Sequence, residues 1–425
     1  MYVKNRYSSR GIGHVYNELQ QVLRKEGTYM TTPPIRTITF GIDEAHPLTS
    51  AAIERAAFTL REASTRYEAA GYEIQTVRLS TRPIFDDLAD WPPVELLNYA
   101  RELQHMLDDY GLSFCSIGTA MAARPDFPLE KIHVIADLLA ATSALNATVQ
   151  LATVRYGLRA AAALPTAEVI KRLAAETQEG FGNFRFVMLS CVEAGGPFFP
   201  SAYHSGPASL SLGLQGAGII AEALRNLRAD EGSPLDLAFV SERVKAAIIE
   251  QVQPVVMLAD ELGAAHGLIF GGIDLSPAPL GEDSITAAME LCGYGPFGTT
   301  GTLAVSAAVT AALKNTGVLD LPTCGYCGLM LPVLEDAALG RRWEEGYVNA
   351  HQLLLYSAVC GTGLDTLPLS GDITAGEIAH LLLDVATLAL RLNKPLSARL
   401  FPVPGKRSGE RTSFTSPYLT NTLVR

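Results

Sequence analysis

Charge is scarce in this sequence. Of its 425 residues, 33 are Lys or Arg and 44 are Asp or Glu, so charged residues make up 18 %, below the roughly 25 % of a typical soluble domain. The net charge of −11 argues against a broad surface for nucleic acids or anionic membranes. Apolar residues, at 48 %, exclude a disordered chain. The sparse charge also favours a buried subunit interface.

Cysteines and long apolar runs are also few. Six Cys in a chain of this length exclude a small disulfide-stapled scaffold. The uncharged stretch Leu291–Leu313 contains Pro296 and several Gly and Thr residues, which is typical of a loop followed by a helix and not of a membrane span. Residues 1–29 lack the apolar core of a signal peptide. These absences predict a cytoplasmic protein with reduced thiols and no membrane partner.

The first 29 residues differ from the rest and carry one short helical stripe, from Val15 to Leu23. The codons for Lys25-Glu26-Gly27 can read as a bacterial ribosome-binding sequence at a suitable distance before Met30. Two interpretations stay open: residues 1–29 are upstream sequence read in frame, or they form a short N-terminal helix. In either case we predict a single domain over residues 30–425.

Short β-type runs alternate with amphipathic helices along residues 30–425. This alternation predicts βαβ units and a mainly parallel sheet, in the form of a large closed α/β barrel or a very wide sheet. The expected strands are Arg36–Ile42, Glu73–Leu79, Leu112–Ile117, Leu145–Val149, Phe184–Cys191, Leu210–Leu214, Leu268–Leu275, Leu329–Val333 and Leu396–Pro402.

The expected helices include Ala51–Ala70, Pro93–Tyr110 and Thr374–Leu392. Thr166 is expected to cap a helix over Ala167–Glu176. A long helix over Leu237–Leu262 is expected to kink or break near Pro254 and to end at Gly263.

Dense Gly/Pro loops follow several of these strands, and such loops build the functional site at the carboxyl ends of parallel strands. Asp274 ends a strongly apolar run, where a carboxylate is costly to bury without a partner, so it is the first catalytic candidate. The other acid/base candidates are His204, Glu193 and Asp283, with Ser276, Ser284 and Asn146 as ligand-binding residues. Asp283 or Ser284 could instead cap a helix. Asp274, Asp283 and His204 could hold a divalent cation, but no spacing requires a metal.

The segment Gly298–Thr302 is a hydroxyl-rich turn before a helix. Its residues Thr299, Thr300, Gly301 and Thr302 could cradle a carboxylate or phosphate, although a plain Thr N-cap explains them better. The preceding residues match GxGxxG, but they follow a helix and not a strand, so a dinucleotide cofactor is not predicted.

Cysteine chemistry has two candidate places. Cys324 and Cys327 form a C-x-x-C pair without the two further ligands that structural zinc needs, and buried thiols explain them best. Cys360, in a Gly-rich loop, is a candidate nucleophile if a base lies nearby, and a buried thiol otherwise.

Six segments together resemble one microbial family, domain of unknown function 711, whose members are often called "PFL family protein". They are RTITFGI (36–42), GFGNFRF (180–186), PFFPSAYH (197–204), FGGIDLSPAP (270–279), GTTGT (298–302) and VCGTGLD (359–365). The resemblance implies an α/β barrel of about ten strands, similar to pyruvate formate-lyase and the glycyl-radical enzymes, as a homodimer. The C-terminal segment lacks an Arg-Val-x-Gly-Tyr type radical loop, which excludes glycyl-radical chemistry.

Two functions are compatible with the sequence. The first is an enzyme that acts on a small anionic metabolite by non-radical acid/base chemistry, with its cofactor, if any, unidentified. The second is a non-catalytic barrel that binds a metabolite or serves as a structural homodimer. The enzyme hypothesis requires Asp274, His204 and Cys360 to converge on one small site.

Overall fold

The fold of the chain is mixed α/β. A computed structural model describes residues 32–227, 233–315, 321–359 and 361–425, and residues Pro33–Arg425 form one compact unit. The predicted start at Met30 and the alternative helix at Val15–Leu23 lie outside the described residues.

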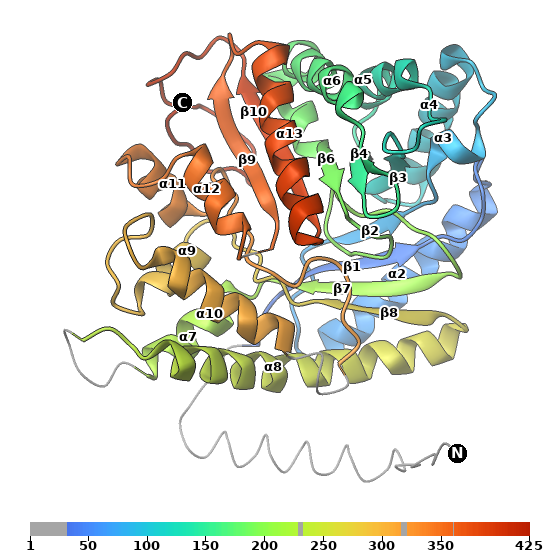
Figure 1. Ribbon diagram of the computed structural model, residues 1–425. Coiled ribbons are helices and arrows are strands. Elements are labelled where there is room, and N and C mark those ends of the chain that lie inside the picture. Colours follow the sequence, from blue (N-terminus) through green and yellow to red (C-terminus); the bar gives the residue numbers. More distant parts are fainter. Residues whose placement is uncertain (1–31, 228–232, 316–320, 360) are drawn as a thin grey trace. The chain divides into compact units, whose positions relative to one another are not determined.

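Ten strands form one sheet, and Figure 1 shows them among the helices. The strands are β1 (Ile35–Gly41), β2 (Val77–Ser80), β3 (Cys115–Ala120), β4 (Leu145–Thr153), β5 (Gly157–Leu158), β6 (Phe186–Ser190), β7 (Ser209–Leu214), β8 (Ile269–Asp274), β9 (Gly363–Ser370) and β10 (Leu396–Val403). Their order is β8-β7-β1-β2-β3-β4-β6-β10-β9, with β5 paired to β4. Strands β1, β2, β3, β4 and β6 run parallel to one another, whereas β7 and β10 are antiparallel to their neighbours β1 and β6.

The two ends of this strand order are linked by one loop segment. Thr323 forms a parallel bridge with Ile273 of β8, and Pro332 forms one with Asp365 of β9. The segment between Thr323 and Pro332 therefore touches both end strands. The arrangement is consistent with an α/β barrel.

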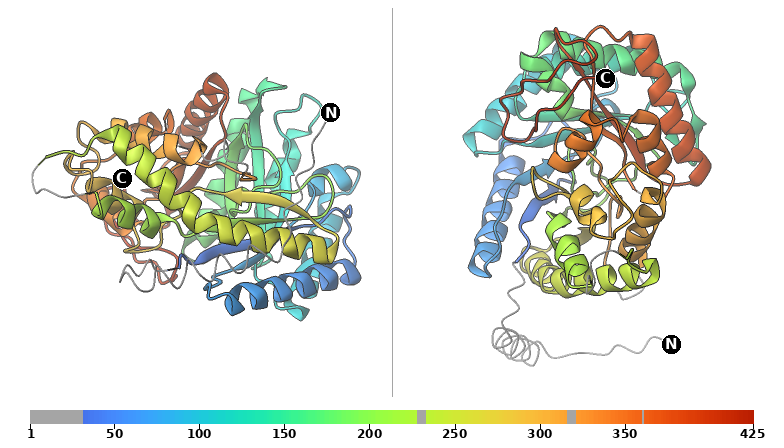
Figure 2. Two further views of the ribbon diagram at one scale, coloured as in Figure 1. Left: turned by 90° about the horizontal axis from the view of Figure 1, so that it is seen from below. Right: turned by 90° about the vertical axis from the view of Figure 1, so that its left-hand side faces the viewer.

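Helices pack against strands along the sheet. The α-helices are α2 (Ser50–Ala69), α3 (Ile84–Asp87), α4 (Pro93–Asp109), α5 (Val134–Ala140), α6 (Ala163–Glu176), α7 (Ala217–Arg225), α8 (Leu237–His266), α9 (Ile285–Glu290), α10 (Thr302–Lys314), α11 (Ala337–Glu344), α12 (Ala350–Ser357) and α13 (Ala375–Leu392). Helix α13 packs on β10, β6 and β4, α2 packs on β1 and β2, and α8 lies along β8 (Figure 2). Short 3₁₀ helices span Leu129–His133, Ala160–Ala162 and Gln178–Arg185. None of the helices in the described part of the chain combines the length and apolar character needed to cross a membrane.

Strand prediction failed at two neighbouring places. The expected strand Leu329–Val333 is wrong, because this segment joins the sheet only through the Pro332 bridge. Strand β9 was missed, since its sequence GLDTLPLS carries Pro368 and no clear alternation of apolar and polar residues.

Helix boundaries also differ from the sequence prediction at two helices. Helix α6 begins at Ala163, so Thr166 does not cap it; the Thr166 hydroxyl instead donates to the Ala162 carbonyl inside the helix. Helix α8 passes through Pro254 without a break and ends at Gly267, whose φ of 66° suits glycine. Apolar side chains on both sides of Pro254, including Val252 and Val255, are buried, and this packing holds the helix together.

Candidate functional site

A cavity of about 70 Å³ lies near the amino ends of several parallel strands. Four strands of the parallel set each contribute their second residue to its lining: Arg36 of β1, Arg78 of β2, Asn146 of β4 and Val187 of β6. Strand β10 adds Arg399. The cavity therefore lies at the amino ends of these parallel strands, whereas the sequence had indicated their carboxyl ends.

Two β-bulges direct charged side chains toward the cavity. In β1, residues Ile35 and Thr37 pair with the adjacent residues Leu214 and Gly213, which leaves Arg36 as the extra residue. In β9, Leu364 pairs with Ala398 of β10, and Leu367 pairs with Leu400. Three steps along β9 therefore match two steps along β10, and the extra residue lies within Asp365–Thr366. Bulges re-aim side chains, and both Arg36 and Asp365 line the cavity.

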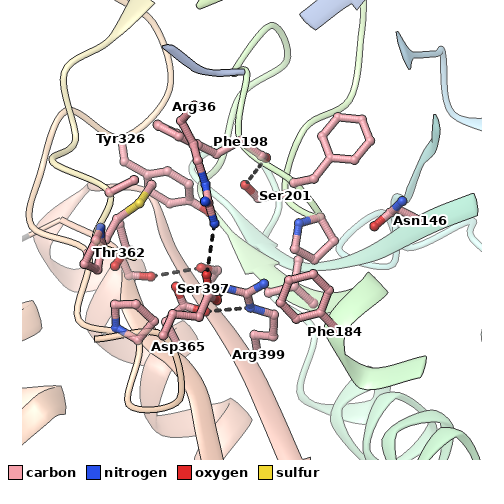
Figure 3. A pocket seen from close by; sticks show the side chains of 18 of the residues that line it. Arg36, Asn146, Phe184, Phe198, Ser201, Tyr326, Thr362, Asp365, Ser397 and Arg399 are labelled. Atoms are coloured by element: carbon pink, nitrogen blue, oxygen red, sulfur yellow. Dashed lines mark hydrogen bonds and ion pairs between the residues drawn. The ribbon is translucent and has the colours of Figure 1, made fainter. Parts of the chain in front are cut away.

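Arg399 holds the two carboxylates of the cavity. Its Nε donates to Asp365 Oδ1 at 2.6 Å, and its Nη2 donates to Glu335 Oε1 at 2.5 Å. Arg36 Nη2 approaches the other Glu335 oxygen at 3.5 Å. Figure 3 shows Arg36 and Arg399 reaching the same region of the cavity from different strands. Burial raises the pKa of Glu335, although Arg399 and Arg36 oppose that effect.

Arg78 has no such partner. Its guanidinium lies over the rings of Phe114 and Phe199, with the Cζ atom 5.4 and 5.2 Å from their centroids. Its Nε donates to Thr76 Oγ1 at 3.0 Å, and among the described residues it forms no ion pair. The residue is only 7 % exposed. Burial, together with the neighbouring Arg36, lowers the pKa of Arg78 to about 9, although the Glu335 carboxylate opposes that effect, so Arg78 is still a cation at neutral pH.

Hydroxyl groups complete the lining. The buried Tyr326 hydroxyl has no hydrogen-bond partner of ordinary geometry among the residues described, although Ser201 and Ser397 are near enough to lower its pKa. Burial is the larger effect and raises the pKa of Tyr326 to about 12, so this group is a neutral donor. Figure 3 shows the three side chains around the same space.

Asp274, the first catalytic candidate, lies outside the cavity lining and is fully buried. Its carboxylate accepts hydrogen bonds from the Ser276 hydroxyl and from the backbone N–H groups of Ser276, Tyr326 and Cys327. The Ser276 hydroxyl accepts in turn from Gly328 N–H. Asp274 therefore fixes the loop that carries Tyr326, and its catalytic role stays a prediction.

His204 and Glu193 flank the loop that carries Ser201. His204 is buried, its Nε2–H donates to the carbonyls of Gly206 and Pro207, and its Nδ1 has no partner among the described residues. Burial lowers the pKa of His204. Glu193 is exposed at the start of this loop. Neither residue lines the cavity.

Asp283 and Ser284 are held at the start of α9. Asp283 accepts a hydrogen bond from Gln215, and burial raises the pKa of Asp283. The Ser284 hydroxyl accepts from Ala287 N–H and donates to the buried Asp336. Ser284 is thus the N-cap that the sequence offered as an alternative. Among the residues described, no three His, Cys, Asp or Glu side chains gather where a metal ion could bind.

The hydroxyl-rich turn before α10 bonds within itself. Thr299 Oγ1 donates to the Pro296 carbonyl, and Thr302 Oγ1 accepts from Gly298 N–H. Gly301, with φ 101°, occupies the N-cap position, and Thr300 is exposed. The hollow beside Thr302 measures about 10 Å³, room for about one water. The role of the turn Gly298–Thr302 as an anion cradle stays a prediction.

Of the cysteine candidates, Cys324 and Cys327 lie in the described part of the chain and are not activated. Cys360 lies outside the described residues, so its place relative to Asp274 and His204 is not given. Burial and the neighbouring Asp274 raise the pKa of the Cys327 thiol to about 12 and that of Cys324 well above its ordinary value. Both thiols are therefore protonated at neutral pH.

Of the candidates named from the sequence, Asn146 lines the cavity. Sequence reasoning missed Arg36, Arg78, Arg399 and Glu335. A signal was present, because the three arginines stand in segments that were recognised as apolar strands, where an unpaired cation is costly. The six motif segments held a second signal, since five of them contribute a lining residue: Arg36, Phe184, Phe198, Pro279 and Asp365.

Comparison with known proteins gives the family. The sequence profile of the family described as Uncharacterised ACR (DUF711) matches residues 29–415, so the chain belongs to this family and the prediction from its motifs is confirmed. A UPF0210 protein of Pyrobaculum aerophilum is 30 % identical over 354 residues, covering 80 % of this chain and 76 % of the relative. A UPF0210 protein of Clostridium beijerinckii is 29 % identical over 401 residues, covering 89 % of this chain and 88 % of the relative.

Proposed function

We propose that this protein binds a small anionic metabolite in the cavity around Arg78. The observation that carries the proposal is the buried Arg78 guanidinium, which forms no direct ion pair with a carboxylate among the described residues and interacts with Glu335 only at longer range. A buried charge without a direct ion pair costs on the order of several kcal/mol of folding free energy, and a bound anion reduces that cost. The shared role of five motif segments in the lining supports a functional cavity.

The proposed binding mode follows from the contacts of Arg78. Two aromatic rings contact the guanidinium, and its Nε is already bonded to Thr76. No described residue accepts a hydrogen bond from its Nη atoms, so these are available to a ligand. Two parallel N–H groups match the two oxygens of a carboxylate, which is the geometry that arginine provides and lysine does not.

Non-radical acid/base chemistry on the bound anion is the enzymatic form of this proposal. Glu335 supports it, because one of its oxygens is bonded to Arg399, while among the described residues the other has only the 3.5 Å contact with Arg36. Tyr326 supplies a neutral hydroxyl that makes no hydrogen bond of ordinary geometry among the described residues and lies beside Ser201 and Ser397. A proton acceptor and a proton donor thus line the space beside the proposed anchor. His204, Asp274 and Cys360 stay candidates on sequence grounds.

A non-catalytic metabolite-binding protein is the second candidate. It is favoured by the closed hydrogen bonding of Asp274, which uses that carboxylate for loop structure. The barrel similar to pyruvate formate-lyase belongs to the proposal as well, supported by the loop segment that bridges β8 and β9. The homodimer remains a prediction from the family resemblance, and the cytoplasmic location remains a prediction from the sequence.

Calorimetric titration with a panel of small carboxylates, phosphate and sulfate tests the proposal. We expect the wild type to bind at least one of these anions and Arg78→Gln to lose about tenfold or more in affinity, in line with loss of a charge-assisted pair. Arg155→Gln is the matched control, because Arg155 is exposed and also lies over a ring, that of Tyr156. Equal binding by both variants would contradict the proposal.

A further inference from the structure

The charges and hydroxyls of the cavity define a narrower ligand class. We infer that the cavity takes a small, singly charged carboxylate that carries a hydroxyl or oxo oxygen beside the carboxyl group. This inference rests on the anion site proposed above and specifies what that site selects.

The charge of the ligand follows from the formal charges of the side chains that line the cavity. Arg36, Arg78 and Arg399 contribute three positive charges, and Glu335 and Asp365 contribute two negative ones. Each carboxylate accepts a hydrogen bond from Arg399 and forms an ion pair with it. The cavity therefore carries one net positive charge. A monoanion neutralises it, whereas a dianion leaves an uncompensated negative charge in a buried site.

The size of the ligand follows from the cavity volume. At about 10–15 Å³ for each water-sized position, 70 Å³ corresponds to about five to seven positions. A carboxylate with two or three further non-hydrogen atoms fills this space. Phe198 and Val187 provide apolar walls, so the ligand has room for a short carbon skeleton but few further charges.

The hydroxyl or oxo oxygen of the ligand is inferred from the hydroxyl groups that line the cavity. Tyr326 Oη is buried without a hydrogen-bond partner of ordinary geometry among the described residues, which is costly unless a ligand supplies one. Ser201 and Ser397 line the same space. A hydroxyl or oxo group adjacent to the carboxylate would accept from Tyr326 while the carboxylate is bound by Arg78.

Three probes of similar size separate these features. Glycolate has one charge and a hydroxyl, propionate has one charge and no hydroxyl, and oxalate has two charges. At pH 8, titration calorimetry of the wild type is expected to show glycolate binding about tenfold tighter than either of the others.

Two variants move these preferences in opposite ways. Glu335→Gln raises the net charge of the cavity by one, so oxalate affinity is expected to rise at least about tenfold relative to glycolate. In Tyr326→Phe, glycolate is expected to bind no more tightly than propionate. Glycolate is still expected to bind more tightly than oxalate in this variant. Glu345→Gln is the control, because Glu345 pairs with Arg342 away from the cavity. If Glu335→Gln does not fold, Asp365→Asn makes the same charge change.

The outcomes separate the two proposals. Oxalate or phosphate binding through Arg78 more tightly than glycolate in the wild type would overturn this inference and leave the anion site standing. An unchanged oxalate-to-glycolate ratio in folded Glu335→Gln and Asp365→Asn would overturn it as well. Failure of every anion in the panel to bind would overturn both.

Discussion

At the scale of single residues, the buried charged groups fall into two kinds. The carboxylates of Asp274 and Asp336 are surrounded by donors from neighbouring loops, so they stabilise local structure. Arg78 is a buried charge with an incomplete set of partners. The sequence could show that Asp274 was costly to bury, but not whether its partners would come from the protein or from a ligand.

Asp274→Asn tests the structural role of this carboxylate. The amide NH₂ would face a backbone N–H donor, so we expect the free energy of unfolding to fall by about 2–4 kcal/mol. Asp236→Asn is the control, since Asp236 is an exposed N-cap of α8 and Asn caps nearly as well, at a cost under about 0.5 kcal/mol. Urea unfolding measures both. Wild-type stability in Asp274→Asn would contradict this role.

His46 gives the protein a pH-dependent stability. It is buried between Tyr99 and Thr81, and burial lowers its pKa to about 4. The unfolded chain binds a proton near pH 6.5 while the folded chain does not. Stability from His46 is therefore complete above about pH 7 and falls by about 3 kcal/mol as the pH drops to about 4.

Replacement of His46 should flatten this dependence. In His46→Gln the unfolding free energy should lose about 3 kcal/mol less than in the wild type between about pH 7 and pH 4. His105→Gln, at an exposed position of α4, should follow the wild-type curve. Urea titrations across this pH range measure the slopes, and parallel curves for His46→Gln and the wild type would refute the assignment.

At the scale of elements, the sequence predicted those whose periodicity is strong. Strand β1 and helices α2 and α13 lie within a residue or so of their expected bounds, because apolar spacing and caps such as Thr374 mark them. The bulges in β1 and β9 could not be predicted, since they depend on pairing between segments far apart in the chain. These bulges direct the side chains of Arg36 and Asp365 toward the cavity, so the place of these two residues in the site could not be predicted from the sequence either.

Pro254 is an internal defect of α8. It removes one backbone hydrogen bond, yet the helix continues past it to His266. Pro254→Ala is therefore expected to raise the free energy of unfolding by about 1–3 kcal/mol. Gln253→Ala, at the exposed neighbouring position, should change it by less than about 0.5 kcal/mol. A destabilised Pro254→Ala in urea unfolding would show that the proline fits a local bend in α8.

At the scale of the whole molecule, segments far apart in the sequence meet at one cavity. Residues from β1, β2, β4, β6, β9 and β10 line it, together with loops that carry Ser201, Pro279 and Tyr326. The chain is poor in charge overall, but three arginines and two acids are gathered here. The motif segments identified the family from sequence. That five of them line one cavity became visible only in the folded structure, because it depends on the order of the strands in the sheet.

A crystal structure of the protein grown with glycolate tests the central claim most directly. The account predicts the carboxylate of glycolate within hydrogen-bond distance of the Arg78 Nη atoms and its hydroxyl at Tyr326 Oη. A cavity that contains only water at saturating glycolate, or glycolate bound at another place while the Arg78 guanidinium stays unpaired, would contradict it.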